Sequence, residues 1–197
     1  GYLSVAIKTE EKGSRANGEE SGSMVESDIN SVYLLLFKGS DYKICPNPNA
    51  PGSYYIKVTN PTDNKMTAQI YKDSKELLVI VNPGPKLLDV IKNTNASSTY
   101  ATVNAAITGV TRSDVYGSEG FAMISSGNEP DKGDWAAGST LDLPFTDITG
   151  YIQDSKDVPD EKRVKIKVER LASKIFMQVA STVTIPADTQ FEFTDWT

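Results

Sequence analysis

Few residues in this sequence could do chemistry, and the types that are missing are informative. The chain of 197 residues contains no histidine, which removes the commonest general base, the Ser-His-Asp and Cys-His arrangements, and most zinc and copper sites. Cys45 is the only cysteine, so no intrachain disulfide can form. It lies in a Pro- and Asn-rich segment with no base to activate it. We therefore interpret Cys45 as a small apolar residue.

The remaining candidates for chemistry are the carboxylates of Asp131 and Asp134, which flank Lys132 and precede Trp135. Paired carboxylates can hydrolyse glycosides, and acidic, glycine-containing loops can bind calcium. The spacing matches no calcium-loop pattern, and the environment rather than the presence of such groups makes them reactive. The sequence predicts a protein that is not an enzyme and holds no cofactor or metal. Trp135 is a candidate ligand contact, because an exposed indole can stack on a sugar.

Charge and hydropathy exclude two further classes of partner. Acidic residues outnumber basic ones by 26 to 20, the net charge is −6, and no basic cluster occurs, so we expect no binding to nucleic acid. No apolar run approaches the ~20 residues of a membrane-spanning helix. The chain begins at Gly1 without a signal sequence. We expect a trimmed or processed chain, so that any targeting segment lies outside these residues.

The first strand and the segment behind it form the most informative local pattern. From Tyr2 to Lys8 the residues alternate, with Leu3, Val5 and Ile7 on one face, which predicts a half-buried strand. A polar stretch rich in Gly, Ser and Glu follows. Structureless loops longer than ~12–15 residues are uncommon in compact domains and are usually functional or disordered. We predict a removable first strand over residues 1–9 and a flexible loop over residues 10–28.

The rest of the chain alternates short apolar runs with turn signals. Strands are predicted over 29–37, 54–58, 66–71, 76–81, 121–124, 141–143, 164–168, 174–180, 183–185 and 191–193. Helical spacing after Pro85 predicts a helix to residue 92, and a second helix is predicted over 99–107. Many short strands with one helical excursion indicate an all-β, mostly antiparallel β-sandwich in a single domain.

A strand on a long tether can be exchanged. Three inward residues would each contribute ~1.5–3 kcal/mol when fully buried, a sum comparable to the ~5–15 kcal/mol that stabilises a whole domain. Their removal would leave an apolar groove and two unpaired sheet edges, which can recruit a strand from another chain. The tether carries Arg15, one of only four arginines, and proteases cut flexible loop tips. Taken alone, an arginine in a mobile loop more often has no role in processing.

Several segments occur in an order that spans most of the chain. They are Leu3-Ser4-Val5-Ala6-Ile7, the Arg-bearing loop, residues 28–37, Leu77-Leu78-Val79-Ile80-Val81-Asn82 before a helix, Phe121-Ala122-Met123-Ile124-Ser125, and Val168-Glu169-Arg170-Leu171-Ala172-Ser173-Lys174-Ile175. As an ordered set they resemble the N-terminal domain of the Bacteroidales fimbrillins, the type V pilins.

This resemblance implies a transthyretin-like β-sandwich, made as a lipoprotein precursor and carried to the outer membrane. In such pilins an Arg-specific protease cuts the loop after the first strand, and a strand of a neighbouring subunit fills the groove. Arg15 matches the cleavage site, and Leu3, Val5 and Ile7 match the strand that is lost. Shaft subunits usually have a second, C-terminal sandwich that donates the strand, and residues 1–197 contain none. We therefore expect an N-terminal domain of a longer protein.

The leading hypothesis is thus a structural, adhesive subunit of a cell-surface fimbria, assembled with other fimbrial subunits by protease-gated strand exchange. The alternative is a secreted adhesin or ligand-binding β-sandwich module, such as an anchor or tip subunit, which recognises a host protein or glycan through Trp135. In an anchor subunit the Arg15 loop would not be processed. A hydrolase would require an acidic cleft, for which the sequence offers no pattern.

Overall fold

The computed structural model describes residues 1–9, 28–108, 110, 116–125 and 145–171. Most of its regular structure is β-strand, with two short helices, as predicted. The strands are β1 (Tyr2–Thr9), β2 (Ser31–Lys38), β3 (Lys43–Ile44), β4 (Ile56–Thr59), β5 (Lys65–Gln69), β6 (Glu76–Val81), β7 (Tyr116–Gly117), β8 (Gly120–Phe121), β9 (Met123–Ser125), β10 (Thr146–Asp147) and β11 (Val164–Arg170). The helices are α1 (Pro85–Lys92) and α2 (Tyr100–Thr108), and short 3-10 turns lie at Thr62–Asn64, Thr149–Tyr151 and Asp160–Lys162.

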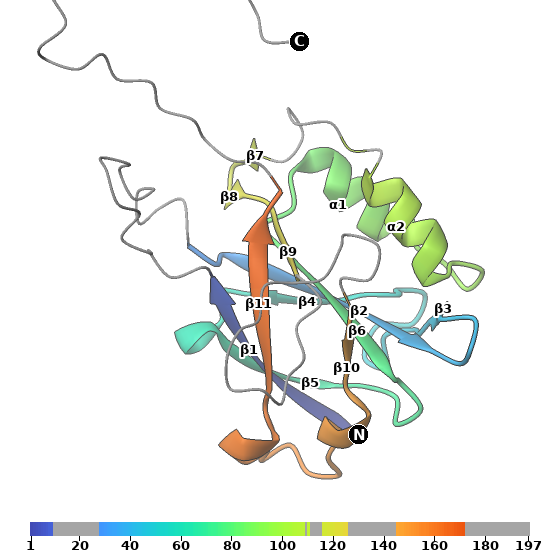
Figure 1. Ribbon diagram of the computed structural model, residues 1–197, viewed down its shortest axis with the longest axis vertical. Coiled ribbons are helices and arrows are strands. Elements are labelled where there is room, and N and C mark those ends of the chain that lie inside the picture. The colour runs from blue at the N-terminus through green and yellow to red at the C-terminus, as the bar shows by residue number, and fades with distance from the viewer. Residues whose placement is uncertain (10–27, 109, 111–115, 126–144, 172–197) are drawn as a thin grey trace, which may run out of the picture.

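Nine strands form one curled sheet. Its order is β3-β2-β6-β9-β11-β1-β5, with β4 also beside β2 and β10 also beside β6, and β7 and β8 form a separate hairpin. The pairs within this sheet are antiparallel except that between β1 and β11, which is parallel. The sheet folds over, so that β1, β5 and β11 cover one face of β2 and β6 (Figure 1). The all-β, mostly antiparallel prediction is confirmed.

β2 and β6 are central because both of their faces are apolar. Leu34 and Val79 point into the core shared with β1, β5 and β11, whereas Leu35 and Leu78 point to the opposite side. All four are fully buried. A nearly continuous apolar run is what a strand covered on two sides requires, and the strand predicted over residues 29–37 corresponds to β2.

The helices cover the outer face of β2 and β6 and make a third layer (Figure 1). α1 begins at Pro85, where a missing N–H costs nothing, and its Leu87 and Ile91 are fully buried. In α2 the ring of Tyr100 meets that of Phe37 edge-on, with 5.5 Å between centroids. Both helices lie within a residue of the predicted ranges.

Candidate functional site

β1 is an interior strand with a hydrogen-bonded neighbour on each side. It pairs in parallel with β11, with Val5 opposite Val164, and in antiparallel fashion with β5, with Val5 opposite Met66. Removal of β1 would therefore expose unpaired backbone groups on two strands at once. This pairing agrees with the sequence-based expectation that loss of the first strand would leave two unpaired edges.

The inward face of β1 is buried as predicted. Leu3 and Val5 are 0% exposed and Ile7 is 5% exposed, and all three belong to the core between the two halves of the sheet. Full burial of these side chains contributes about 5–9 kcal/mol in total before chain entropy is subtracted. The core residues against which this face packs form the floor of the slot that β1 occupies.

The start of β1 is fixed by backbone hydrogen bonds on both sides. Tyr2 N donates to Gln153 O at 2.7 Å and Gln153 N donates to Tyr2 O at 2.9 Å, while Ile70 N donates to Gly1 O at 2.9 Å. The segments after β5 and before β11 thus hold the first residues from opposite flanks. Beyond these residues β5 pairs with Tyr2–Ala6 and β11 with Val5–Thr9.

Ser4 gives the outward face of β1 a polar contact that sequence reasoning missed. The residue is 0% exposed, although the alternation places it opposite the core. Its Oγ donates to Met66 O at 3.3 Å and accepts from Thr67 Oγ1 at 3.2 Å. These bonds satisfy a buried hydroxyl, which would otherwise be costly, and they join β1 to β5.

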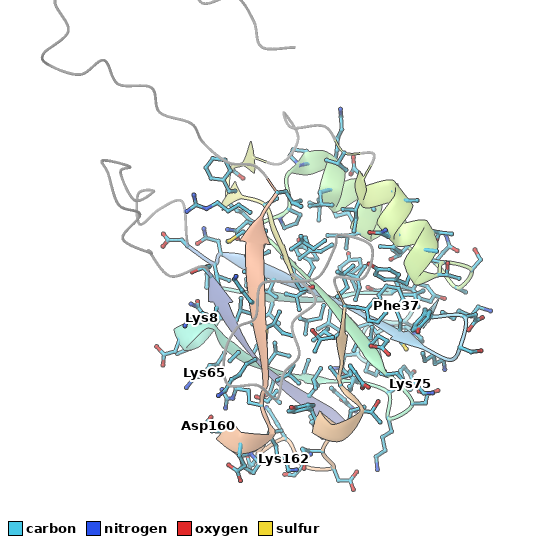
Figure 2. All side chains as sticks on the ribbon, in the orientation of Figure 1. Lys8, Phe37, Lys65, Lys75, Asp160 and Lys162 are labelled. Carbon is cyan, nitrogen blue, oxygen red and sulfur yellow. The ribbon has the colours of Figure 1, made fainter. Side chains whose placement is uncertain are left out.

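Lysines gather on the same outward face. Ala6 lies opposite Lys165 of β11 and opposite Lys65 of β5, and both lysines are exposed. One step further along, Lys8 lies opposite Lys167. Figure 2 labels Lys8 and Lys65 on the flank formed by β1 and β5. The cluster could be found only once the strand register was known.

The chain segment that enters β2 is held by a buried asparagine. Asn82 has φ 47°, and its Oδ1 accepts hydrogen bonds from the backbone N–H groups of Asn30 at 2.9 Å and Ser31 at 3.1 Å. Its Nδ2 donates to Asp28 O at 2.6 Å. Ser31 Oγ in turn donates to a carboxylate oxygen of Glu119. Residues 28–31 are therefore fixed independently of β1.

Several predicted features lie outside the described residues. These are Arg15 with most of the predicted 10–28 loop, the Asp131 and Asp134 carboxylates, Trp135, and the predicted strands over 141–143, 174–180, 183–185 and 191–193. The structure therefore does not relate Arg15 or Trp135 to the slot around β1.

Cys45 is buried and accepts a hydrogen bond from Ser74 Oγ at 3.5 Å. Burial raises the pKa of its thiol above the usual value, against a smaller lowering by Ser74 and Lys38. A raised pKa disfavours the reactive thiolate. The interpretation of Cys45 as a packed apolar residue agrees with this environment.

Glu76 is the carboxylate whose environment is most unusual among the described residues. It begins β6, opposite Phe37 of β2 and Asp147 of β10, and its Oε2 is buried without a hydrogen-bond partner in the described part of the chain. Burial raises its pKa to about 7; Asp147 adds to the rise and Lys75 opposes it. Two facing carboxylates at a strand end resist joint ionisation.

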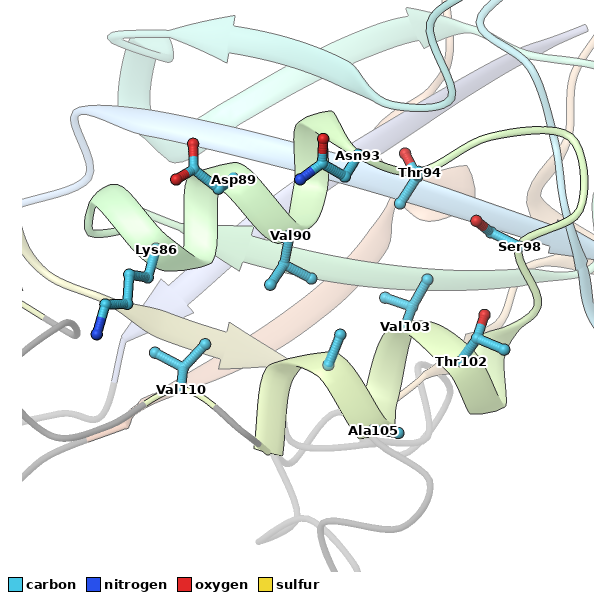
Figure 3. A pocket seen from close by; sticks show the side chains of 11 residues that line it. Lys86, Asp89, Val90, Asn93, Thr94, Ser98, Thr102, Val103, Ala105 and Val110 are labelled. Carbon is cyan, nitrogen blue, oxygen red and sulfur yellow. The ribbon is translucent and has the colours of Figure 1, made fainter.

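A groove of about 520 Å³ lies between α1 and α2 (Figure 3). Its polar lining groups largely cap the helices: Thr94 Oγ1 donates to Ile91 O at 2.7 Å, and Thr102 Oγ1 donates to Thr99 O at 2.9 Å. The charged side chains that line it are Lys86 and Asp89. This arrangement resembles an ordinary seam between two packed helices rather than a set of convergent binding groups.

The described residues include no group of three or more His, Cys, Asp or Glu side chains that could hold a metal ion. No helix among them is long and apolar enough to cross a membrane. Neither a protein-family model nor a curated protein sequence matches the chain.

Proposed function

We propose that the chain is a structural subunit of a bacterial surface fimbria, in which β1 is replaced by a strand of a neighbouring subunit after cleavage at Arg15. The supporting observation is the environment of β1. This strand is paired on both sides, its Leu3 and Val5 are fully buried, and it is followed in sequence by a stretch rich in Gly, Ser and Glu. A vacated slot would offer two backbone edges and an apolar floor, which is what strand addition requires.

Cleavage can gate such an exchange because a tether raises effective concentration. While β1 is covalently attached, it competes for its slot at an effective concentration of about millimolar. After the tether is cut, β1 competes only as a free peptide, and a strand from another subunit with equal contacts can replace it. Residues 28–31 remain held by Asn82, so the cut does not release β2.

The resemblance to the Bacteroidales fimbrillins supplies the biological setting of this proposal. The precursor is a lipoprotein carried to the outer membrane, its partners are other fimbrial subunits and an Arg-specific protease, and it performs no catalysis. The alternative, a secreted adhesin or an anchor or tip subunit, depends on Trp135, and no described residue favours it.

The test is brief digestion of the folded chain with an Arg-specific protease, followed by mass spectrometry and size-exclusion chromatography. We expect an early cut after Arg15, a folded remainder, and oligomers that form only after the cut. Arg15→Ala should abolish both the cut and the oligomers. Resistance of Arg15, or a cut without any change in stability or association, would favour the alternative.

A disulfide lock separates cleavage from strand release. Ala6→Cys combined with Lys65→Cys places two thiols on directly opposite residues of antiparallel strands, where Cα atoms are about 4.5–5.5 Å apart and within reach of a disulfide. The oxidised double variant should be cut at Arg15 yet remain monomeric, and reduction should restore assembly. Assembly of the oxidised form would exclude departure of β1 as its cause.

A further inference from the structure

The two faces of the slot around β1 favour different residue types in the strand that occupies it. Ala6 is flanked on one side by Lys165 and on the other by Lys65, each directly opposite in register. Opposite residues on neighbouring strands project to the same face with Cβ atoms about 5 Å apart. Two exposed ammonium-bearing side chains therefore border one small uncharged residue, in a chain whose net charge is −6.

Protection of a sheet edge explains only part of this arrangement. Lys65 lies on β5, the terminal strand of the sheet order, where lysine commonly discourages edge-to-edge association. Lys165 lies on β11, where it pairs with Ala6 of β1, whereas β11 pairs with β9 only over Val168–Arg170. Discouraging edge-to-edge association does not require the two lysines to lie opposite the same residue. The two side chains have in common that both flank the slot at the position of Ala6.

We propose that the slot selects an incoming strand with an acidic residue at the position of Ala6. This inference rests on the proposed strand exchange and specifies its partner. The preferred strand carries apolar residues at the positions of Leu3, Val5 and Ile7 and a small hydroxyl residue at the position of Ser4. Its carboxylate at the Ala6 position lies between Lys165 and Lys65.

The same lysines make the resident strand replaceable. β1 supplies no carboxylate between Lys165 and Lys65, because its residue there is Ala6. Opposite-charge pairs across strands are favourable and like-charge pairs are unfavourable. A strand with glutamate at this position should therefore bind about 3- to 10-fold more tightly than its glutamine counterpart at low salt, and one with lysine should bind more weakly than both.

A displacement experiment on the complete chain tests this preference. A site for a sequence-specific protease is placed within residues 12–17, the chain is cut there, and the retained first strand carries a fluorophore. Peptides with the sequence of residues 2–9, and with Glu, Gln or Lys in place of Ala6, then compete for the slot. We expect the order Glu, Gln, Lys, with differences that shrink in 0.5 M NaCl as charges are screened.

Two controls define the slot and the charge effect. A peptide with Asp in place of Val5 should not compete, because it puts a charge on the apolar floor. In a chain carrying Lys165→Gln and Lys65→Gln, the Glu and Gln peptides should compete equally. Equal competition by all three peptides against the unmodified chain would overturn the charge preference and leave strand exchange intact. No displacement even by the unmodified peptide would overturn the exchange itself.

A second measurement needs no exchange. In the intact chain, Ala6→Glu, Ala6→Gln and Ala6→Lys change the charge on the retained β1, and Glu and Gln have nearly the same shape. The Tm should be highest for Ala6→Glu and lowest for Ala6→Lys at low salt, and the three should converge at high salt. A Tm for Ala6→Glu no higher than that for Ala6→Gln would contradict the proposed preference.

Discussion

β6 and β1 are both interior strands, but they differ in what covers their second face. In β6, Val79 faces the core while Leu78 and Ile80 face the helices, and all are 0% exposed. In β1 only one face is apolar, and the other carries the hydrogen-bonded Ser4 and the half-buried Ala6 between two lysines. A strand covered on two apolar faces admits few substitutes, whereas a replacement for β1 must be apolar on one face only.

The largest difference between β1 and β6 should appear when the same charged residue is placed in each strand. Leu78→Asp should prevent folding, because a carboxylate would be buried among helix side chains at a cost of several kcal/mol. Val5→Asp should displace β1 and leave β2, β6 and the helices folded. Hydrogen exchange with mass spectrometry would distinguish the two variants. Loss of amide protection in β2 and β6 in Val5→Asp would show that β1 is as indispensable as β6.

Asn82 tests whether the β2 side of the molecule is anchored without β1. Asn82→Ala should lower the free energy of unfolding by about 2–4 kcal/mol, because three hydrogen bonds are lost and alanine is strained at positive φ. Urea denaturation would measure the loss. Asn82→Gly removes only the side-chain bonds and Asn82→Asp keeps the acceptor, so both should cost less. A change below about 0.5 kcal/mol would mean that residues 28–31 are held by other contacts.

Glu76 is the ionisable residue at the start of the otherwise apolar β6, and its ionisation should make the stability of the fold depend on pH. Its folded-state pKa of about 7 exceeds the ordinary value of 4.5, so the folded state binds more protons between these values. Stability should be greatest below pH 4.5 as far as this group is concerned, and its contribution should be lost as pH rises to about 7. At pH 8 Glu76→Gln should stabilise by on the order of 1 kcal/mol, after solvent screening of a partly exposed group is allowed for.

The readout for Glu76→Gln is the midpoint of urea unfolding at several pH values. The variant and the parent protein should coincide below about pH 4.5 and diverge progressively between pH 4.5 and about 7, with a constant difference at higher pH. Asp147→Asn is the matched control, because it removes the facing carboxylate and should lower the pKa of Glu76. A constant difference between Glu76→Gln and the parent at all pH values would assign the effect to packing instead of ionisation.

The smallest expected effect concerns the outward face of β1. Ser4→Ala and Thr67→Val should each cost about 1 kcal/mol, because each removes a partner of the Ser4–Thr67 hydrogen bond. The double variant should cost less than the sum, and the difference reports the coupling. Strict additivity in thermal unfolding would mean that this hydrogen bond contributes nothing to the retention of β1.

Periodicity predicted most elements but not their partners. The alternation of Leu3, Val5 and Ile7 located β1 and its buried face, and the apolar run before Lys38 located a strand buried on two sides. Two-residue strands such as β3 and β10 carry too little pattern to be found. The parallel pairing of β1 with β11 was not predictable either, because alternation specifies which face is buried and says nothing about which strand lies alongside.

The same limit applied to the site. Ser4 occupies an outward position by alternation, and its burial depends on Met66 and Thr67 of another strand. Lys65 and Lys165 are distant in sequence and meet only through the register of β1. Asn82 follows the apolar run of β6, and its side-chain bonds to residues 28–31 could not be read from composition. Arg15 and Trp135 remain predictions.

The parallel pairing of β1 with β11 also bears on the order of folding events. Residue 5 finds its partner at residue 164, so this contact closes one of the longest loops in the chain and forms at a high entropic cost. Contacts of large sequence separation slow folding. β2, β6 and the helices, which follow one another closely, should assemble first, and β1 should dock last. During synthesis the edge of β1 that pairs with β11 would stay open until β11 has left the ribosome, which is an interval in which a chaperone could pair with it.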